Sequence, residues 1–176
     1  MPGQTAPPTN LREVTREVSS DNSPDNPLVA HLRRQVANAF VIYTNYKHYH
    51  WQTYGPLFRD LHLMLDEFAE DVLESIDTLA ERVRMIGQDP PGHLMNMVEL
   101  ATVKASVDEK GSMQAMIQEA QANAVIAIKE LREGAKLADE HDDPGSVDLC
   151  SKIVQIYEKQ EWWLRDILRK RDGLCN

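Results

Sequence analysis

The longest regular pattern in this sequence is a run of apolar residues that recur every third or fourth position between residues 58 and 83. Its members are Phe58, Leu61, Leu65, Phe68, Val72, Ile76, Leu79 and Val83. This spacing places all of them on one side of a helix of about seven turns. Pro56 is expected to begin the helix, and Gly87 with the prolines after it to end it. One helix cannot bury such a stripe alone, so the pattern requires a bundle of helices.

Three other segments carry the same spacing. The first begins at Asn26 and Pro27, a typical N-cap followed by a typical first helical residue, and ends near Tyr54. The second follows Ser112, and the third follows Pro144. A shorter helix is expected within residues 93–103. The pattern therefore predicts an all-α protein, a ferritin-like four-helix bundle with a short extra helix in the connection between its second and third long helices.

Length and composition indicate one domain with a tail. The 176 residues, 42% of them hydrophobic, suffice for a single well-filled core. Residues 1–26 are rich in Pro, Ser, Thr and Asn and are predicted to form a flexible N-terminal arm. Residues 27–172 are predicted to form the bundle, and residues 173–176 the C-terminal end. No apolar run is long enough to cross a bilayer and no secretory signal is recognisable, so we expect a cytoplasmic protein.

A second line of side chains on the helix over residues 58–83 carries metal-ligand groups. His62 and Asp66 form one i,i+4 pair, and Asp77 and Glu81 form another. Each pair taken alone is equally consistent with a surface pair that stabilises the helix. His62 and Glu81, however, are separated by roughly 28 Å of helix axis, so one rigid helix cannot bring both pairs to a single ion. If these residues are ligands, each pair must find its partner on another chain.

His50 joins this set from the preceding helix. It continues the apolar side of that helix and should point into the bundle near His62. A hydrogen-bonded core histidine is the alternative interpretation of His50 by itself. Imidazoles with carboxylates and no thiolate suit Fe(II), Mn(II) or Zn(II), and carboxylates also hold the harder Fe(III) ion. The residues therefore predict a metal site between subunits of a helical oligomer.

One stretch of the sequence resembles the signature of the Dps family, the ferritin-like DNA-binding proteins from starved cells. The matching residues are His50-Trp51, Gly55-Pro56, Phe58, Leu61-His62, Asp66-Glu67, Asp77 and Ala80-Glu81-Arg82. The resemblance covers roughly residues 27–170 and implies a dodecameric shell with ferroxidase sites at its two-fold interfaces. It also implies that one subunit supplies His50, His62 and Asp66, and its mate supplies Asp77 and Glu81.

The resemblance further implies an activity. Fe(II) would be oxidised at the site, preferably by hydrogen peroxide and otherwise by dioxygen, and Fe(III) would be stored as a mineral in the cavity. Zn²⁺ is a further candidate for the same ligands. Trp51 is expected beside the site, either as a radical sink or as a packing aromatic. A di-iron site inside one bundle is disfavoured, because no histidine here has a glutamate three residues before it.

Acidic residues cluster where the last long helix begins. Asp143 precedes Pro144 and is a good N-cap. The resemblance nevertheless implies that Asp148, and in some family members a residue matching Asp143, lines a pore at the three-fold axis. Rings of carboxylates concentrate cations. We therefore treat Asp143 and Asp148 as candidate metal-binding residues, and Asp142 as only a neighbour.

DNA binding is the alternative function, with iron oxidation secondary. The N-terminal arm offers Arg12 and Arg16, but four acidic residues accompany them. The net charge of the chain is -9, which repels a polyanion. Phosphate contacts require many cationic groups. We expect weak or absent DNA binding, and no membrane partner.

Overall fold

Five helices make up the part of the chain that the computed structural model describes, residues 26–106 and 111–169. They are α2 (Pro27–Gln52), α3 (Phe58–Met85), α4 (Leu94–Leu100), α5 (Met113–Glu140) and α6 (Pro144–Ile167). No strand occurs within those ranges, and none of these helices has the length and apolarity needed to cross a membrane. The predicted arm, apart from Asn26, and the predicted C-terminal end, residues 173–176, lie outside the described residues.

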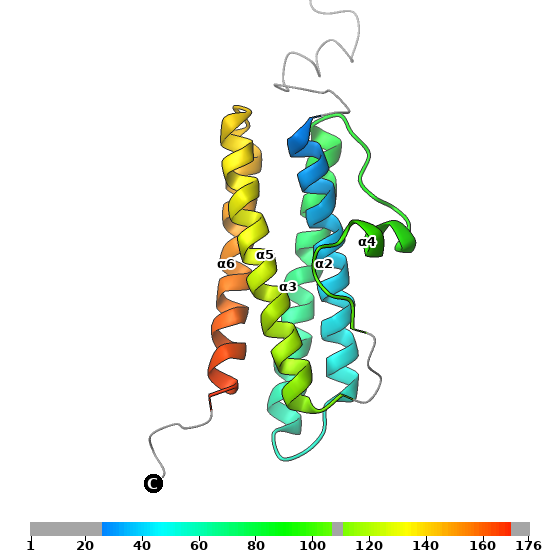
Figure 1. Ribbon diagram of the computed structural model, residues 1–176, viewed down its shortest axis with the longest axis vertical. Helices are drawn as coiled ribbons and strands as arrows, with labels where there is room; N and C mark the ends of the chain where they lie inside the picture. Colours follow the sequence, from blue (N-terminus) through cyan, green and yellow to red (C-terminus); the bar gives the residue numbers. More distant parts are fainter. Residues whose placement is uncertain (1–25, 107–110, 170–176) are drawn as a thin grey trace, which may run out of the picture.

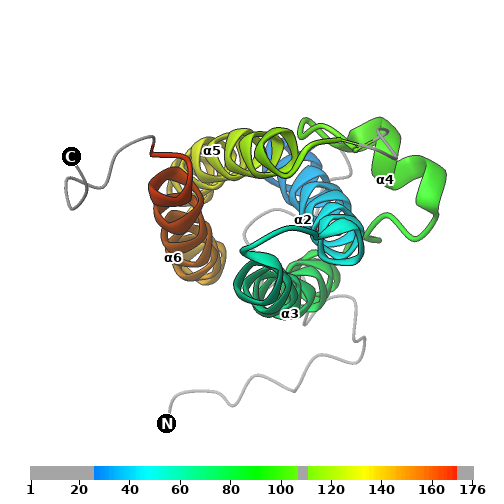
Figure 2. The same cartoon turned by 90° about the horizontal axis from the view of Figure 1, so that it is seen from below.

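The four long helices form a bundle, which confirms the predicted ferritin-like fold class. Helices α2 and α3 make one antiparallel pair, and α5 and α6 make the other (Figure 1). Seen along the bundle, the four surround a common centre, and α4 lies outside them beside α2 (Figure 2). The chain from the end of α3 to the start of α5 therefore returns along the whole bundle, and α4 is part of that crossover.

Side-chain caps fix three of the four long-helix starts where the sequence predicts them. Asn26 accepts a hydrogen bond from the Leu28 amide at 2.8 Å. Ser112 accepts one from the Ala115 amide at 3.1 Å. Asp143 caps α6 in the same way and accepts a hydrogen bond from the Ser146 amide. Each cap satisfies an amide that has no partner within its helix.

The start of α3 differs from the prediction. It begins at Phe58 and not at Pro56. Residues 55–57 form a turn before the helix, and Gly55, the first of them, has a φ of 89°. Glycine adopts this left-handed conformation without the steric cost that a side chain brings. At the other end, α3 stops before Gly87, which also has a positive φ of 85°. That stop is the predicted one.

The buried side of each helix follows the predicted apolar stripe, with two exceptions. Phe58 belongs to the predicted stripe but is 47% exposed, and Ile167, which the same spacing places on the inward side of the segment after Pro144, is 39% exposed. The two residues lie at the same end of the bundle, where α3 begins and α6 ends (Figure 1). Helical periodicity gives the direction of a side chain, but it does not say whether a neighbouring helix extends far enough to cover it.

Buried asparagines hold the crossover against the bundle. Asn123 of α5 accepts from the Lys104 amide at 2.9 Å and donates to the Lys104 carbonyl at 2.8 Å. Asn45 of α2 donates to the same carbonyl at 2.8 Å. Asn38 accepts from the Thr102 amide at 2.8 Å. These amides replace the strand or helix partners that an extended backbone segment lacks inside a protein.

We predict that Asn123→Leu destabilises the protein by about 1–3 kcal/mol, because it removes the buried amide that hydrogen-bonds both the Lys104 amide and the Lys104 carbonyl. Gln118→Ala, an exposed change on the same helix, should stay within about 0.5 kcal/mol. Denaturant unfolding followed by circular dichroism measures both free energies. Equal stability of Asn123→Leu and the unsubstituted protein would contradict the proposed role of Asn123 in holding the crossover.

Candidate metal centre

The turn between α2 and α3 brings two histidines face to face. His50 lies two residues before the end of α2, and His62 lies in the first turns of α3. The helices run antiparallel, so both residues come to the same level. The imidazole rings stack with centroids 3.6 Å apart and planes inclined by 20°. Phe58 also stacks on His62, with a centroid distance of 5.1 Å, so the position of the His62 ring is fixed from its own helix as well.

Each imidazole is oriented by the backbone of the other histidine. His50 Nδ1 lies 2.8 Å from the carbonyl oxygen of His62, and His62 Nδ1 lies 3.0 Å from the carbonyl oxygen of His50. A carbonyl oxygen only accepts, so both Nδ1 atoms must carry the proton. In the neutral imidazole, Nε2 then keeps its lone pair. Metal-binding histidines are commonly prepared in this way.

Asp66 adds a carboxylate to the histidine pair. It follows His62 by one turn, and its Oδ1 is 4.0 Å from His50 Nδ1. Lys47 of α2 forms an ion pair with the same oxygen. The hydrogen bond from Lys47 lowers the pKa of Asp66. The carboxylate is therefore ionised at neutral pH, and a cation already balances it.

Asp77 and Glu81 do not approach this cluster. Both are exposed on α3, and Asp77 lies roughly 16 Å along the helix axis from Asp66. Within the described residues, no group of three or more His, Cys, Asp or Glu side chains is placed to hold a metal ion. One chain thus presents two separated sets of ligand-type groups. The structure brings together His50, His62 and Asp66, and it leaves the other two predicted ligands apart.

Trp51 projects from the last turn of α2. Its side chain is 70% exposed, so it is not a packing aromatic within its own bundle. It directly follows His50 in sequence, so it lies at the end of α2 that carries the predicted half-site, the cluster of His50, His62 and Asp66. The single chain therefore leaves this large aromatic surface uncovered next to the predicted ligands.

Asp143 and Asp148 occupy different environments at the start of α6. Asp143 is buried, and Oδ1 accepts from the Ser146 amide at 3.0 Å and also pairs with Arg82. Its Oδ2 accepts from the Ser146 hydroxyl at 2.8 Å. Asp148 is 63% exposed and pairs with Lys152 one turn further along. A cavity of about 350 Å³ nearby is lined by Asp139, Asp142, Asp143, Pro144, Val147, Asp148 and Ser151.

Comparisons with known proteins agree with this geometry. A Ferritin-like domain matches residues 29–173. The DNA protection during starvation protein of Brevibacillus brevis is 34% identical over 78% of this chain and 91% of its own length. The Dps crystal structure from Thermosynechococcus elongatus is 42% identical with a TM-score of 0.81, covering 85% of this chain and 94% of that one.

The chain belongs to the Dps family. A third relative, the Dps protein of Vibrio cholerae, is described as a member of a broad superfamily of ferritin-like diiron-carboxylate proteins. It is 28% identical with a TM-score of 0.80, over 94% of this chain and all of its own. The family predicted from the sequence is confirmed, and the Dps fold is present along almost all of the described chain.

Lys47, which no sequence pattern nominated, lies beside His50 and Asp66 and pairs with Asp66. The available signal was its position three residues before His50, because residues three apart share a helix face. From the sequence alone, a lysine at this position is expected to be a solvent-exposed charge, because its partner Asp66 lies on another helix. If Asp66 binds a cation, the ammonium group of Lys47 must leave it first.

We predict that Lys47→Gln makes the assembled protein bind its first divalent cation about two- to five-fold more tightly, since a partly exposed ion pair is worth up to about 1 kcal/mol. Titration calorimetry with Co(II) measures the affinity. Arg132→Gln removes an ion-paired cation from α5, which carries no predicted ligand, and should leave the affinity unchanged. Weaker binding by Lys47→Gln would mean that Lys47 orients Asp66 more than it competes for it.

Proposed function

We propose that this protein is a Dps-type ferroxidase and iron-storage protein that protects against oxidative stress. It would oxidise Fe(II) at sites shared by two chains and store the Fe(III) as a mineral inside a hollow homo-oligomeric shell, expected to be a dodecamer. The observation that carries the proposal is the separation of the ligands on α3. His62 and Asp66 lie beside His50, whereas Asp77 and Glu81 lie exposed further along the same rigid helix.

The half-site suits iron as a substrate. The Nε2 atoms of His50 and His62 and the ionised Asp66 would receive Fe(II), and the partner subunit's Asp77 and Glu81 would complete the coordination. Hydrogen peroxide takes up two electrons when it is reduced to water. Two Fe(II) ions oxidised together supply both electrons, so no hydroxyl radical is released. Carboxylates then favour the harder Fe(III) product. Zn²⁺ accepts the same ligands and would act as a competitor.

The relatives support iron and leave DNA as the second candidate. The Vibrio cholerae structure belongs to a diiron-carboxylate superfamily, and the Brevibacillus brevis relative is named for DNA protection. The charge of -9 per chain opposes DNA binding in any symmetric assembly. Arg12 and Arg16, the cations expected to matter for DNA, lie outside the described residues. We therefore place iron oxidation first and expect weak or absent DNA binding.

Complementation between variants tests the shared site. We predict that His62→Ala with Asp66→Ala, and separately Asp77→Ala with Glu81→Ala, each lower Fe(II) oxidation at least about ten-fold, since even the outer partners of metal ligands are worth that much. After dissociation and co-assembly, activity should return, because one of the two sites in each mixed pair carries all its ligands. The rise in Fe(III) absorbance measures the rate.

The control for this experiment is the double variant Glu70→Ala, Glu74→Ala, which removes exposed carboxylates one turn apart on the same helix. It should oxidise Fe(II) at the unsubstituted rate. Full activity in either ligand variant alone, or no recovery in mixtures that demonstrably contain both chains, would end the proposal of a site shared between subunits.

The acids at the start of α6 are proposed to attract Fe(II) to a pore. Asp148 is the better candidate, because it is exposed, whereas both oxygens of Asp143 already accept hydrogen bonds. We predict that Asp148→Asn slows iron uptake a few-fold at low ionic strength, where charges attract over longer distances. Stopped-flow uptake measures the rate, and Glu158→Gln on the same helix is the matched control. Equal uptake rates for both variants would mean that Asp148 only forms a surface ion pair and does not attract Fe(II).

A further inference from the structure

His31 lies buried between α2 and α5, and the proposed iron chemistry does not use it. Its Nε2 lies 2.9 Å from the carbonyl oxygen of Glu130, and its Nδ1 lies 2.9 Å from Nη2 of Arg34. A carbonyl oxygen only accepts and a guanidinium group only donates, so Nε2 carries the proton and Nδ1 keeps its lone pair. The imidazole is therefore neutral, and both of its nitrogens are engaged.

The ring of His31 has no room to turn away from these partners. It packs so closely against Gly134 of α5 that a Cβ atom on this glycine would stand 2.7 Å from Nε2 and 2.9 Å from Cδ2. The same Cβ atom would stand 3.2 Å from Sγ of Cys150 in α6. Arg34 has more freedom, because its side chain is 34% exposed. If the imidazole and the guanidinium group repel each other, Arg34 is the one that can leave.

The groups that set the charge of the ring come from three helices. Arg34 of α2 opposes a second proton on the ring, whereas Glu130 and Glu133 of α5 favour it. Cys150 of α6 is neutral, because burial raises the pKa of its thiol to about 11. Burial of the ring and the charge of Arg34 outweigh the two glutamates, so the pKa of His31 lies below its ordinary value of 6.5.

The carboxylate of Glu130 joins α2 to the crossover. Its Oε2 accepts hydrogen bonds from Arg34 Nε at 2.9 Å and from Gln35 Nε2 at 3.0 Å. Its Oε1 accepts one from the Thr102 hydroxyl of the crossover at 3.3 Å. Burial raises the pKa of Glu130, but the hydrogen bond and the charge of Arg34 outweigh burial, and the pKa lies below its ordinary value. The carboxylate therefore stays ionised when a histidine titrates.

Asn38 of α2 continues this network into the backbone of the crossover. Its Nδ2 donates to Gln35 Oε1 at 3.3 Å and to the Thr102 hydroxyl at 3.1 Å. Its Oδ1 accepts from the Thr102 amide at 2.8 Å and from the Val103 amide at 3.3 Å. The asparagine that holds this part of the crossover is therefore positioned by the partners of Glu130.

We propose that His31 and Arg34 form an acid-sensitive latch on the crossover. When Nδ1 of the ring takes up a second proton, two N–H donors and two positive charges face each other. The ring is held by its packing, so Arg34 leaves its place and Glu130 loses its ion pair. The network around Glu130 then relaxes, and the crossover, which carries α4, loosens where Asn38 holds it.

Acid acts on this latch in one direction. The pKa of His31 is lower in the folded protein than its ordinary value of 6.5. The stability that neutral His31 contributes is therefore complete above pH 6.5 and is lost as the pH falls below it. The latch does not depend on the proposed iron chemistry, because His31 lies roughly 28 Å along α2 from His50.

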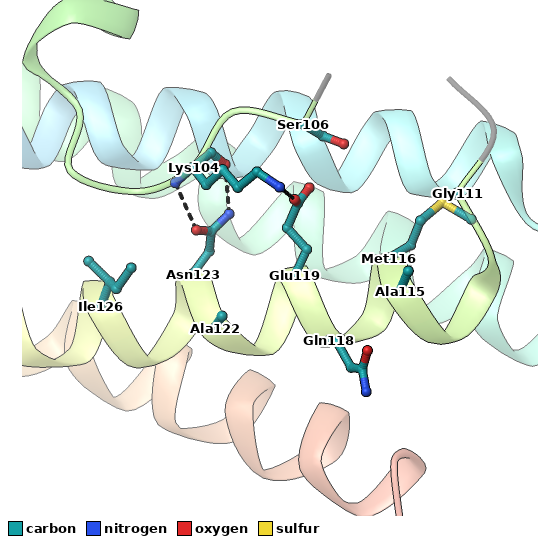
Figure 3. Close-up of a pocket in the computed structure, with 10 residues that line it drawn as sticks. All are labelled: Lys104, Ser106, Gly111, Ala115, Met116, Gln118, Glu119, Ala122, Asn123 and Ile126. Carbon is teal, nitrogen blue, oxygen red and sulfur yellow. Dashed lines mark hydrogen bonds and ion pairs between the residues drawn. The ribbon is translucent and has the colours of Figure 1, made fainter. Parts of the chain in front are cut away.

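A second set of hydrogen bonds holds the crossover and provides an internal reference. Figure 3 shows Asn123 of α5 bonded to the backbone of Lys104, and the Lys104 ammonium group directed at Glu119. Asn45 of α2 accepts from the Ser106 amide at 2.9 Å. Amide side chains do not titrate. Burial raises the pKa of Glu119, but hydrogen bonds, the largest from Lys104, outweigh burial and lower it. These contacts should therefore persist at about pH 5.

Backbone amide exchange in the assembled full-length protein tests the latch. Exchange is followed by mass spectrometry at single-residue resolution from about pH 7.5 to about pH 5, and each rate is corrected for the intrinsic pH dependence of amide exchange. We expect protection of the latch amides, those of Thr102 and Val103, to fall about three- to ten-fold, the effect of one lost hydrogen bond. The Lys104 and Ser106 amides should keep their protection.

His31→Gln is the matched variant, because a glutamine side chain offers N–H donors and an acceptor oxygen but takes up no proton. It should abolish the acid-induced loss of protection at the latch amides. Arg34→Gln removes the ion pair at every pH, so its latch amides should show the low protection already at neutral pH. His141→Gln removes a histidine that caps the end of α5 and should leave the acid-induced loss unchanged.

A direct measurement on His31 completes the test. Deuterium exchange of the imidazole C–H, followed by mass spectrometry, gives the pKa of each histidine. The pKa of His31 should lie below 6.5 and should rise in Arg34→Gln. A pKa at or above 6.5, unchanged protection of the latch amides in acid, or the same loss in His31→Gln overturns the proposal. An equal loss at the Lys104 amide overturns it as well, because the crossover would then open as a whole.

Discussion

The stiffness of α3 is the constraint on which the rest of the site depends. A helix over Phe58–Met85 is about 42 Å long and cannot fold back on itself. Its apolar side is buried in the bundle, which keeps it straight and fixes the direction of every other side chain on it. His62 with Asp66 and Asp77 with Glu81 are thus held apart permanently. Under the proposed function, metal chemistry becomes conditional on assembly, because only a second copy can complete a site.

His50 and His62 are held in fixed orientations by the fold itself. The backbone carbonyls of His50 and His62 accept the Nδ1 protons of each other's rings, so a short connection between two helices sets both tautomers and both ring orientations. Lys47 pairs with Asp66 on the same side of the turn. Under the proposed function, a cation that binds Asp66 would have to displace this ammonium group.

The crossover segment has more than a connecting role. Buried asparagines from α2 and α5 hold its backbone, and Lys104 from the same segment balances Glu119. These hydrogen bonds to the backbone therefore also position the Lys104 ammonium group, which keeps Glu119 ionised beside Tyr49. Polar groups inside a bundle are costly unless they are paired. Here the pairing ties the path of the crossover to the hydrogen bond between Tyr49 and Glu119.

The sequence by itself determined the class of fold and the approximate positions of the helices. It also determined that His62 and Glu81 of one chain cannot bind the same ion. Each of these depends on local chemistry or on helix geometry, which residue spacing specifies directly. It could also nominate His50, although only by its place on a helix face. The i,i+4 spacing of His62 with Asp66, and of Asp77 with Glu81, supplied the other candidate ligands. The family signature added which subunit is expected to supply each pair.

Only the tertiary structure decided which groups meet across helices. The partners of Lys47 and Tyr49 lie 19 and 70 residues away in sequence, and no periodicity encodes such contacts. The exposure of Phe58 and Trp51 depends on how far neighbouring helices extend. The two engaged oxygens of Asp143 depend on Arg82 crossing from α3 as well as on the local cap. Periodicity fixes where a side chain points, but packing between distant segments fixes what it finds there.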